Sequence, residues 1–412
     1  MSRRAVLWVA FALVHIVVAG LGFALPHQPM GDVYLVYEPW ALQALDGRGI
    51  PGIAEDWIYP PVALLPLLAA QALEWIAGYE IAWALLVTAC DALAFRMLVG
   101  DARSRGRRHA AWFWLAFALL LGPVGMYRLD AVTVPLAVAG CLWLVGRPWL
   151  ASVLLAVATW IKVWPAALLA AAFLAVRRRV AVVCGALIVS ALALVTVALL
   201  GGAPHALGFV TAQTGRGLQV EAPVSMLYLW LAAARAPGAS VYYDPVILTF
   251  QVTGPQVDTV IAVMTPLLIA VLVAVAVLGA IAARRGAPFV ALFPPLALAL
   301  VLAFIVFNKV GSPQYLTWLI APLVVGLVIA RDRWRRPAAL GLLLAALTQV
   351  VYPLTYGEVL SADPVAVGIL TVRNALLIVL FVWTVVRLIR LVRGRRAASA
   401  LVGTPRKPEV TP

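Results

Sequence analysis

Residues 26–61 gather polar side chains suited to chemistry in a chain that is otherwise mostly apolar. This stretch holds five of the seventeen acidic residues. Its first carboxylate, Asp32, follows two prolines and a glycine at the point where an apolar run ends. A carboxylate on such a rigid element can take up a proton from a reacting hydroxyl. Asp32 is therefore the candidate catalytic residue.

Asp32 also has a structural interpretation. Residues 33–45 place Tyr34, Tyr37, Trp40 and Leu45 at the spacing of an amphipathic surface helix. Because aspartate is common at the N-terminus of a helix, Asp32 could cap this one. The cap and the catalytic role are compatible, and Asp56 has a similar structural interpretation as a loop or cap residue.

Positive charges outside the strongly basic loops form a second group of candidates. The chain has 31 lysines and arginines, of which only three are lysines. A charge in apolar surroundings is costly, so it tends to be paired or functional. Arg128 can pair with Asp130, and Arg48 and Arg235 can simply be solvated. Converging cations suit a phosphate, and we expect such a role for Lys162, Lys309, Arg216 and Arg373.

Composition defines the broad class. Apolar residues make up 64% of the chain and charged residues 12%, far from the proportions of soluble domains. Apolar runs long enough to cross a bilayer recur without strand-like alternation. The net charge of +14 does not indicate nucleic acid, because the arginines cluster between apolar runs as cytoplasmic anchors do. We predict an all-α polytopic protein whose partner is the lipid bilayer; its oligomeric state stays open.

Cysteine and histidine give no sign of a disulfide framework or a metal site. The three cysteines lie far apart in apolar runs, and the four histidines lack ligand spacing. We therefore predict no metal and no cofactor.

The arginines also predict the orientation of the chain. Arg3 and Arg4 place the N-terminus in the cytoplasm and residues 26–58 outside. The basic loop 101–109 must be inside, so we expect the apolar segment 61–77 to be interfacial or re-entrant. By the same argument, residues 150–176 form a hairpin of two short helices with Lys162 near its outer tip.

This topology has about twelve crossings, an uncleaved first helix and both termini in the cytoplasm of a plasma-membrane protein. Residues 1–396 form one transmembrane domain with outer loops 26–61 and 201–256, the second carrying an amphipathic piece at 223–234. Residues 397–412, rich in proline towards their end, form a disordered cytoplasmic tail. All the candidate phosphate-binding cations map to the outer side.

An acidic residue just after the first helix, followed by an amphipathic outer loop, resembles the GT-C superfamily of polyprenyl-phosphate-sugar glycosyltransferases. Four stretches, in this order, are similar to glycosyltransferase family 87, and the resemblance runs from residue 5 to about residue 390. The stretches are Gly31-Asp32, Ile58-Tyr59-Pro60-Pro61, Ile161-Lys162-Val163-Trp164-Pro165 and Asn308-Lys309-Val310-Gly311-Ser312-Pro313-Gln314-Tyr315-Leu316-Thr317-Trp318.

The resemblance implies an inverting transfer of a sugar from a polyprenyl-phosphate donor to a glycolipid or glycan acceptor outside the membrane. The family includes actinobacterial mannosyltransferases that extend phosphatidylinositol mannosides, so mannose is the expected sugar. Asp32 would be the general base, and no metal is required. Arg128 would join the four outer cations at the donor phosphate. The expected substrate contacts are Tyr59, Trp57, Asp56, Glu221, Gln314 and Tyr315.

Three questions stay open. The aromatic residues can equally be interfacial anchors, and Glu55, Asp56, Asp130 or Glu221 can assist Asp32. A transporter or lipid flippase would share the hydrophobicity and the few buried charges. Transporters often carry internal repeats, whereas this chain has none that is convincing and collects its polar groups on one side. A structural subunit without chemistry would leave the outer cations unexplained.

Overall fold

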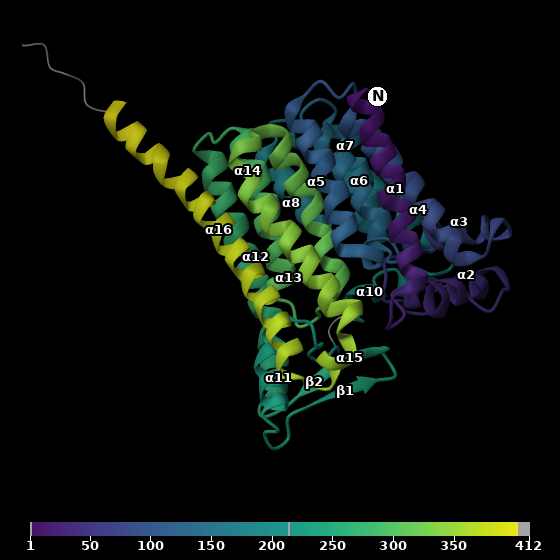
Figure 1. Ribbon diagram of the computed structural model, residues 1–412. Coiled ribbons are helices and arrows are strands. Elements are labelled where there is room, and N and C mark those ends of the chain that lie inside the picture. Colours follow the sequence, from purple (N-terminus) through teal and green to yellow (C-terminus); the bar gives the residue numbers. More distant parts are fainter. Residues whose placement is uncertain (1, 213–214, 403–412) are drawn as a thin grey trace, which may run out of the picture.

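The computed structural model describes residues 2–212 and 215–402, with only the backbone of residues 395–402. It is a bundle of helices with one small β-hairpin (Figure 1). Within the described residues, seven helical segments are long and apolar enough to cross a membrane. These are α1 (Arg3–Ala24), α4 (Tyr79–Val99), α9 (Arg179–Leu199), α12 (Val257–Arg284), α13 (Phe289–Val306), the segment Pro313–Leu354 with α14 (Ile320–Gln349), and α16 (Pro364–Val402).

Shorter helices pack among these segments. They are α5 (Arg105–Leu121), α6 (Asp130–Trp143), α7 (Pro148–Ile161) and α8 (Ala166–Ala175). A helix of 14 residues such as α6 measures about 21 Å, less than the roughly 30 Å of a bilayer core. The expected all-α membrane fold is confirmed in this coarse form, and the count of about twelve crossings stays a prediction.

Helix α14 is a hairpin of two antiparallel halves. Its backbone leaves the helical region at Ala330, with φ −146° and ψ 60°. A side chain added at Gly326 would meet the Trp334 ring, and one added at Gly341 would meet Leu323. Residues before and after Ala330 therefore face each other, and the turn falls beside the arginines at 331–336.

Basic loops from distant parts of the chain meet at one end of the bundle, which we call the basic end. Gly106 lies against the carbonyl oxygens of Leu327 and Val328. Arg387 donates to the carbonyl of Arg333, and Arg285 donates to that of Val392. The N-terminus and the far end of α16 lie at this end as well (Figure 1). This gathering matches the arginine pattern, while the membrane side that it faces stays a prediction.

The two expected outer loops lie towards the opposite end (Figure 1). The apolar segment Pro61–Ile76, which contains α3 (Leu64–Gln71), is shorter than the seven candidate spans, and its interfacial or re-entrant position stays a prediction. The hairpin pairs its strands antiparallel, with Tyr242 opposite Gln251. The short elements here are the π-helical turn Val33–Tyr37, α2 (Glu38–Leu45), α3 (Leu64–Gln71), α10 (Gly208–Thr211), α11 (Met226–Ala233), β1 (Ser240–Asp244), β2 (Thr249–Thr253) and α15 (Tyr356–Leu360).

Short 3-10 and π-helical segments connect many of these elements. The 3-10 turns are Pro61–Ala63, Glu74–Ile76, Gly122–Gly125, Ala203–His205, Pro223–Ser225 and Pro313–Leu319, and a second π-helical turn covers Val350–Leu354. The expected disordered tail, 397–412, overlaps α16, which continues to Val402. Residues 403–412 lie outside the described residues.

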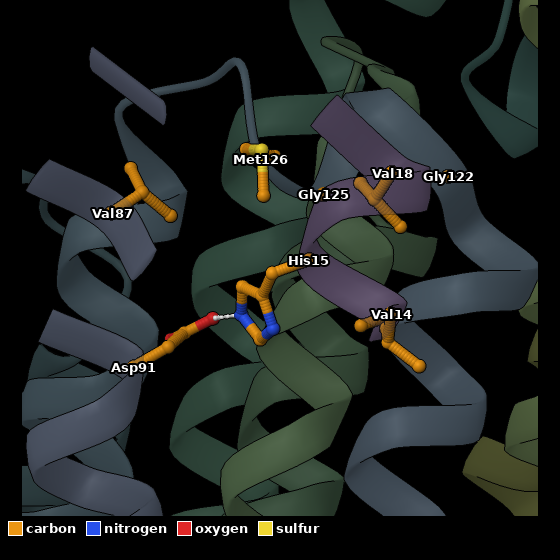
Figure 2. A pocket seen from close by; sticks show the side chains of 9 residues that line it. Val14, His15, Val18, Val87, Asp91, Gly122, Gly125 and Met126 are labelled. Carbon is orange, nitrogen blue, oxygen red and sulfur yellow. Dashed lines mark hydrogen bonds and ion pairs between the residues drawn. The ribbon is translucent and has the colours of Figure 1, made fainter. Parts of the chain in front are cut away.

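A buried polar contact fixes α1 against α4. The Nε2 atom of His15 lies 3.1 Å from Asp91 Oδ2, and its Nδ1 atom lies 2.9 Å from the carbonyl oxygen of Phe11. Since a carbonyl only accepts, Nδ1 carries a hydrogen, and one proton is shared between Nε2 and the carboxyl group. Figure 2 shows this pair beside a cavity of about 20 Å³, room for one water molecule. The contact holds α1, the helix that precedes the first outer loop, against α4.

Candidate active site

Asp32 lies where the first outer loop enters the π-helical turn Val33–Tyr37. Its side chain makes no capping hydrogen bond to the turn, so the helix-cap interpretation is wrong. Instead, its Oδ2 atom lies 3.2 Å from Nε of Arg128, and the Tyr37 hydroxyl donates to the same oxygen at 3.5 Å. The Asp32 side chain is 35% exposed, so it is accessible to a reacting molecule.

Arg128 is buried behind Asp32 and binds the loop on several atoms. Its Nη1 donates to the carbonyls of Pro29 and Tyr127, at 2.8 and 2.9 Å. Its Nη2 lies 3.4 Å from the hydroxyl of Tyr352. Burial alone would lower the pKa of Arg128, but the Asp32 carboxylate beside it raises that pKa above the ordinary value. Arg128 is therefore a permanent cation next to the candidate base.

Tyr352 holds a strained part of the same loop. Its hydroxyl lies 3.1 and 3.3 Å from the carbonyl oxygens of His27 and Gln28. Both of these residues have left-handed backbones, with φ of 58° and 51°. Such a conformation costs roughly 1–2 kcal/mol for a residue with a side chain. External contacts are needed to maintain it; Tyr352 supplies them at His27 and Gln28, and Arg128 binds the adjacent Pro29.

Lys162 and Asp130 form a second ion pair. Lys162 lies in the turn between α7 and α8, and this break into two short helices is the one that the sequence predicts. Its Nζ is 2.5 Å from Oδ2 of Asp130, whose Oδ1 accepts from Trp318 Nε1 at 2.6 Å. Burial would lower the pKa of Lys162, but Asp130 raises it above the ordinary value. Lys162 therefore stays protonated.

Two tyrosine rings flank the Lys162 ammonium. The ring centres of Tyr59 and Tyr315 lie 5.5 and 5.9 Å from Nζ, within the range of cation–π attraction. Both side chains are half-buried. Burial is the main cause that raises the pKa of Tyr59, and the charges of Asp32 and Asp130 raise it further against the opposing effect of Lys162. Tyr59 is thus a neutral phenol in the field of both carboxylates.

The two ion pairs are joined through the backbone of three consecutive residues, 128–130. The ion pair that the sequence suggested between Arg128 and Asp130 does not form among the described residues. Arg128 pairs with Asp32 from the first loop, and Asp130 pairs with Lys162 from the α7–α8 turn. The amide of the intervening Leu129 lies 3.1 Å from the Tyr37 hydroxyl.

The other predicted aromatic residue packs inside the protein. Trp57 is buried and meets Tyr59 edge to face. On the other side, Trp318 stacks between Tyr315 and Trp164, with ring centres 4.1 and 5.6 Å away. These contacts orient Tyr59 and Tyr315 around Lys162 and leave Trp57 no exposed face.

Arg216 and Lys309 lie on segments next to this cluster. Arg216 is half-buried, and it is close enough to act on the Tyr315 phenol electrostatically. Its Nε has no hydrogen-bond partner in the part of the chain that the structure describes. Lys309 is 5% exposed, and burial lowers its pKa. Its carbonyl accepts from the amide of Gln219 at 3.0 Å, which ties the segment after α13 to the segment of Arg216.

Arg373 and Glu221 differ from the expectation that they face a substrate. Arg373 Nη2 lies 2.9 Å from Glu221 Oε2, and both side chains are at most 4% exposed. Burial raises the pKa of Glu221 to about 7, because it outweighs the attraction of Arg373 and Arg128. The pair fixes the second outer loop on α16 and offers no surface to a ligand.

The remaining predicted residues lie in different settings. Gln314 is buried, and its Oε1 accepts from the Ser312 hydroxyl at 2.5 Å. Asp56 is exposed and lies 2.7 Å from Nδ1 of His205, which links the two outer loops. No group of three or more His, Cys, Asp or Glu arranged to hold a metal occurs within residues 2–212 and 215–402.

Two residues of the cluster were missed or left unassigned from the sequence. The sequence leaves Asp130 open, as a partner of Arg128 or as a residue that assists Asp32, because its partner Lys162 lies 32 residues away. Tyr352 is not among the residues predicted from the sequence. A signal was present, since Tyr352-Pro353 follows an apolar run and repeats the Tyr59-Pro60 pair of the first loop.

The apolar helices and the cluster of carboxylates and cations at one end indicate a membrane protein with a polar site. Residues 57–252 match the model of glycosyltransferase family 87, which indicates a glycosyltransferase. No curated protein matches the chain. The matched region contains Tyr59, Arg128, Asp130, Lys162 and Arg216, and Asp32 precedes it.

Proposed function

We propose that the protein is a multi-pass inverting glycosyltransferase of the GT-C type in the plasma membrane. It moves a sugar, mannose by resemblance, from a polyprenyl-phosphate donor to a glycolipid or glycan acceptor on the outer face, with both termini in the cytoplasm. The observation that carries this proposal is the accessible Asp32 carboxylate, linked through residues 128–130 to the Lys162 ammonium. The family match supports the reaction class.

In this proposal Asp32 is the general base. It removes the proton of the acceptor hydroxyl while the hydroxyl oxygen bonds to the anomeric carbon of the sugar. The bond between that carbon and the phosphate oxygen breaks on the opposite face, so the configuration inverts. The lipid phosphate leaves with the bonding electrons, and Asp32 then releases its proton to water. The donor is a substrate, and the scheme uses no cofactor.

Lys162 and Arg216 are the proposed donor-phosphate ligands, with Lys309 on the adjoining segment. An ammonium has three N–H donors, and Asp130 takes one from Lys162, so two remain for phosphate oxygens. Cations held in place before the reaction stabilise the charge that develops on the leaving phosphate. Arg373 and Glu221 are left out because they are buried against each other.

Tyr59 and Tyr315 are the proposed substrate contacts nearest to this phosphate site. Their phenols lie on either side of Lys162 and can donate to sugar hydroxyls or stack on the sugar ring. Asp56 and Gln314 remain secondary candidates for contacts with the acceptor and the donor.

The test compares Asp32→Asn with Asp46→Asn, purified in lipid nanodiscs and supplied with labelled polyprenyl-phosphate mannose and a phosphatidylinositol-mannoside acceptor. Asp46 lies in the same loop, exposed and paired with Arg48, so its variant keeps its activity. Loss of a general base lowers the rate about 100- to 10,000-fold. Normal turnover by Asp32→Asn would overturn the proposal.

A second assay separates transfer from transport. In proteoliposomes, a transferase releases lipid phosphate only when acceptor is present. A transporter moves the labelled lipid between leaflets without acceptor and leaves its sugar in place. Replacing the mannose donor by the glucose donor tests the sugar.

A further inference from the structure

We infer that Arg128 is a positioning residue for Asp32, and that it does not bind the donor phosphate as the sequence suggested. This inference rests on the proposed function, because it assigns Arg128 a role through the proposed base. It concerns the geometry of the first outer loop, in which Arg128 contacts side chain and backbone at once.

All three nitrogen atoms of the Arg128 guanidinium already face oxygen atoms of the protein. Nε faces the Asp32 carboxylate, Nη1 donates to the carbonyls of Pro29 and Tyr127, and Nη2 faces the Tyr352 hydroxyl. The residue is 5% exposed. A phosphate would have to displace these partners, and the carbonyl oxygens would then be left buried without a donor.

Arg128 binds the chain segment that carries Asp32 at two points. It binds the carbonyl of Pro29 and the carboxylate of Asp32, three residues apart. The two residues before this segment, His27 and Gln28, are held in left-handed conformations by Tyr352. Since the strained backbone does not maintain itself, the position of the Asp32 carboxylate depends on Arg128 and Tyr352.

The same short stretch of chain also positions the proposed phosphate ligand. Asp130, two residues after Arg128, is fully buried and binds Lys162 with one oxygen and Trp318 with the other. Arg128 and Asp130 thus each position a residue of opposite charge. Arg128 acts through a carboxylate and Asp130 acts through an ammonium, so residues 128–130 set the separation between the two halves of the proposed site.

The experiment measures steady-state kinetics of Arg128→Gln, Arg128→Lys and the double variant Asp32→Asn/Arg128→Gln in nanodiscs. For Arg128→Gln we expect kcat to fall up to about 100-fold, the cost of a base displaced by about 1 Å. The donor KM should change less than about threefold, and Arg128→Lys should recover part of kcat. The double variant should be no slower than Asp32→Asn, because two residues that act as a unit are not additive.

Lys162→Gln and Arg48→Gln serve as comparisons. Lys162→Gln should raise the donor KM, as expected of a phosphate ligand. Arg48→Gln, an exposed residue of the same loop, should match the wild type. A rise in donor KM with unchanged kcat for Arg128→Gln, or additive losses in the double variant, would overturn the inference.

If Arg128→Gln does not fold, Tyr352→Phe tests the same inference, since it removes only the hydroxyl that contacts His27, Gln28 and Nη2 of Arg128. It should lower kcat and leave the donor KM unchanged; wild-type kcat would contradict the inference. Failure of the proposed function has a different signature. In that case Asp32→Asn itself retains full transfer, or the wild type shows none.

Discussion

Lys162 and Asp130, 32 residues apart in the chain, form an ion pair with Nζ 2.5 Å from Oδ2. The Asp130 side chain is fully buried and that of Lys162 is 13% exposed. Taking two charges out of water is costly, and the pair is maintained because each charge compensates the other. Removing one partner therefore has a larger effect than removing both.

The first prediction concerns this pair. Asp130→Asn leaves the Lys162 ammonium buried without its counter-charge, so the free energy of unfolding should fall by about 3–5 kcal/mol. The double variant Asp130→Asn/Lys162→Met removes both charges and should recover most of that loss. Thermal unfolding in detergent measures both effects. Equal instability of the double and the single variant would show that the pair is not a unit.

The second prediction concerns pH and Glu221, whose pKa is raised from 4.5 to about 7 in the folded protein. Between these values the folded state binds more protons than the unfolded state, so the free energy of unfolding falls as pH rises through this window. Each unit of pKa is worth about 1.4 kcal/mol, so the fall is on the order of 3 kcal/mol.

Thermal unfolding of the wild type and Glu221→Gln from pH 4 to pH 8 tests this effect. The variant should lose the dependence. Glu55→Gln, a matched change at an exposed residue, should keep it. A wild-type stability that rises with pH across the whole window would contradict the sign.

The third prediction concerns the α14 hairpin. Gly326→Ala would place a methyl group within 2.2 to 2.7 Å of the Trp334 ring atoms, a distance that forces the two halves of the hairpin apart. Overpacking of this kind typically costs 1–3 kcal/mol. Gly20→Ala is the control: Gly20 lies in α1 with nothing within 4 Å. That change should be neutral or stabilising, since alanine favours the helix by up to about 1 kcal/mol.

Much of the helical framework could be predicted from sequence because the signals are local. The break between α7 and α8 coincides with Lys162 and Pro165, which disfavour a continuous apolar helix. The turn of α14 coincides with the arginines at 331–336. In each case the deciding residues lie within or beside the element.

The contacts of the candidate site could not be predicted in the same way. Whether Arg128 pairs with Asp130 or with Asp32 depends on how α6 and the first loop pack. The sequences of apolar helices of similar composition do not predict which helices pack against each other. The hairpin β1–β2 was also missed. Its strands lie in loop 201–256, for which the sequence predicts only an amphipathic helix. A strand of five residues has too short a hydrophobic pattern to be recognised by itself.

The hydrogen bonds from Tyr352 to the first loop have a consequence for biosynthesis. His27 and Tyr352 are 325 positions apart, and a ribosome adds on the order of 5–20 residues per second. The first loop therefore leaves the ribosome well before the residue that completes it. A nascent or truncated chain that lacks Tyr352 retains the contacts of Arg128 with Pro29 and Asp32, but the carbonyls of His27 and Gln28 lack the Tyr352 hydroxyl. The candidate site is therefore complete only after Tyr352 has been synthesised, when all the helices that precede it in the chain are already made.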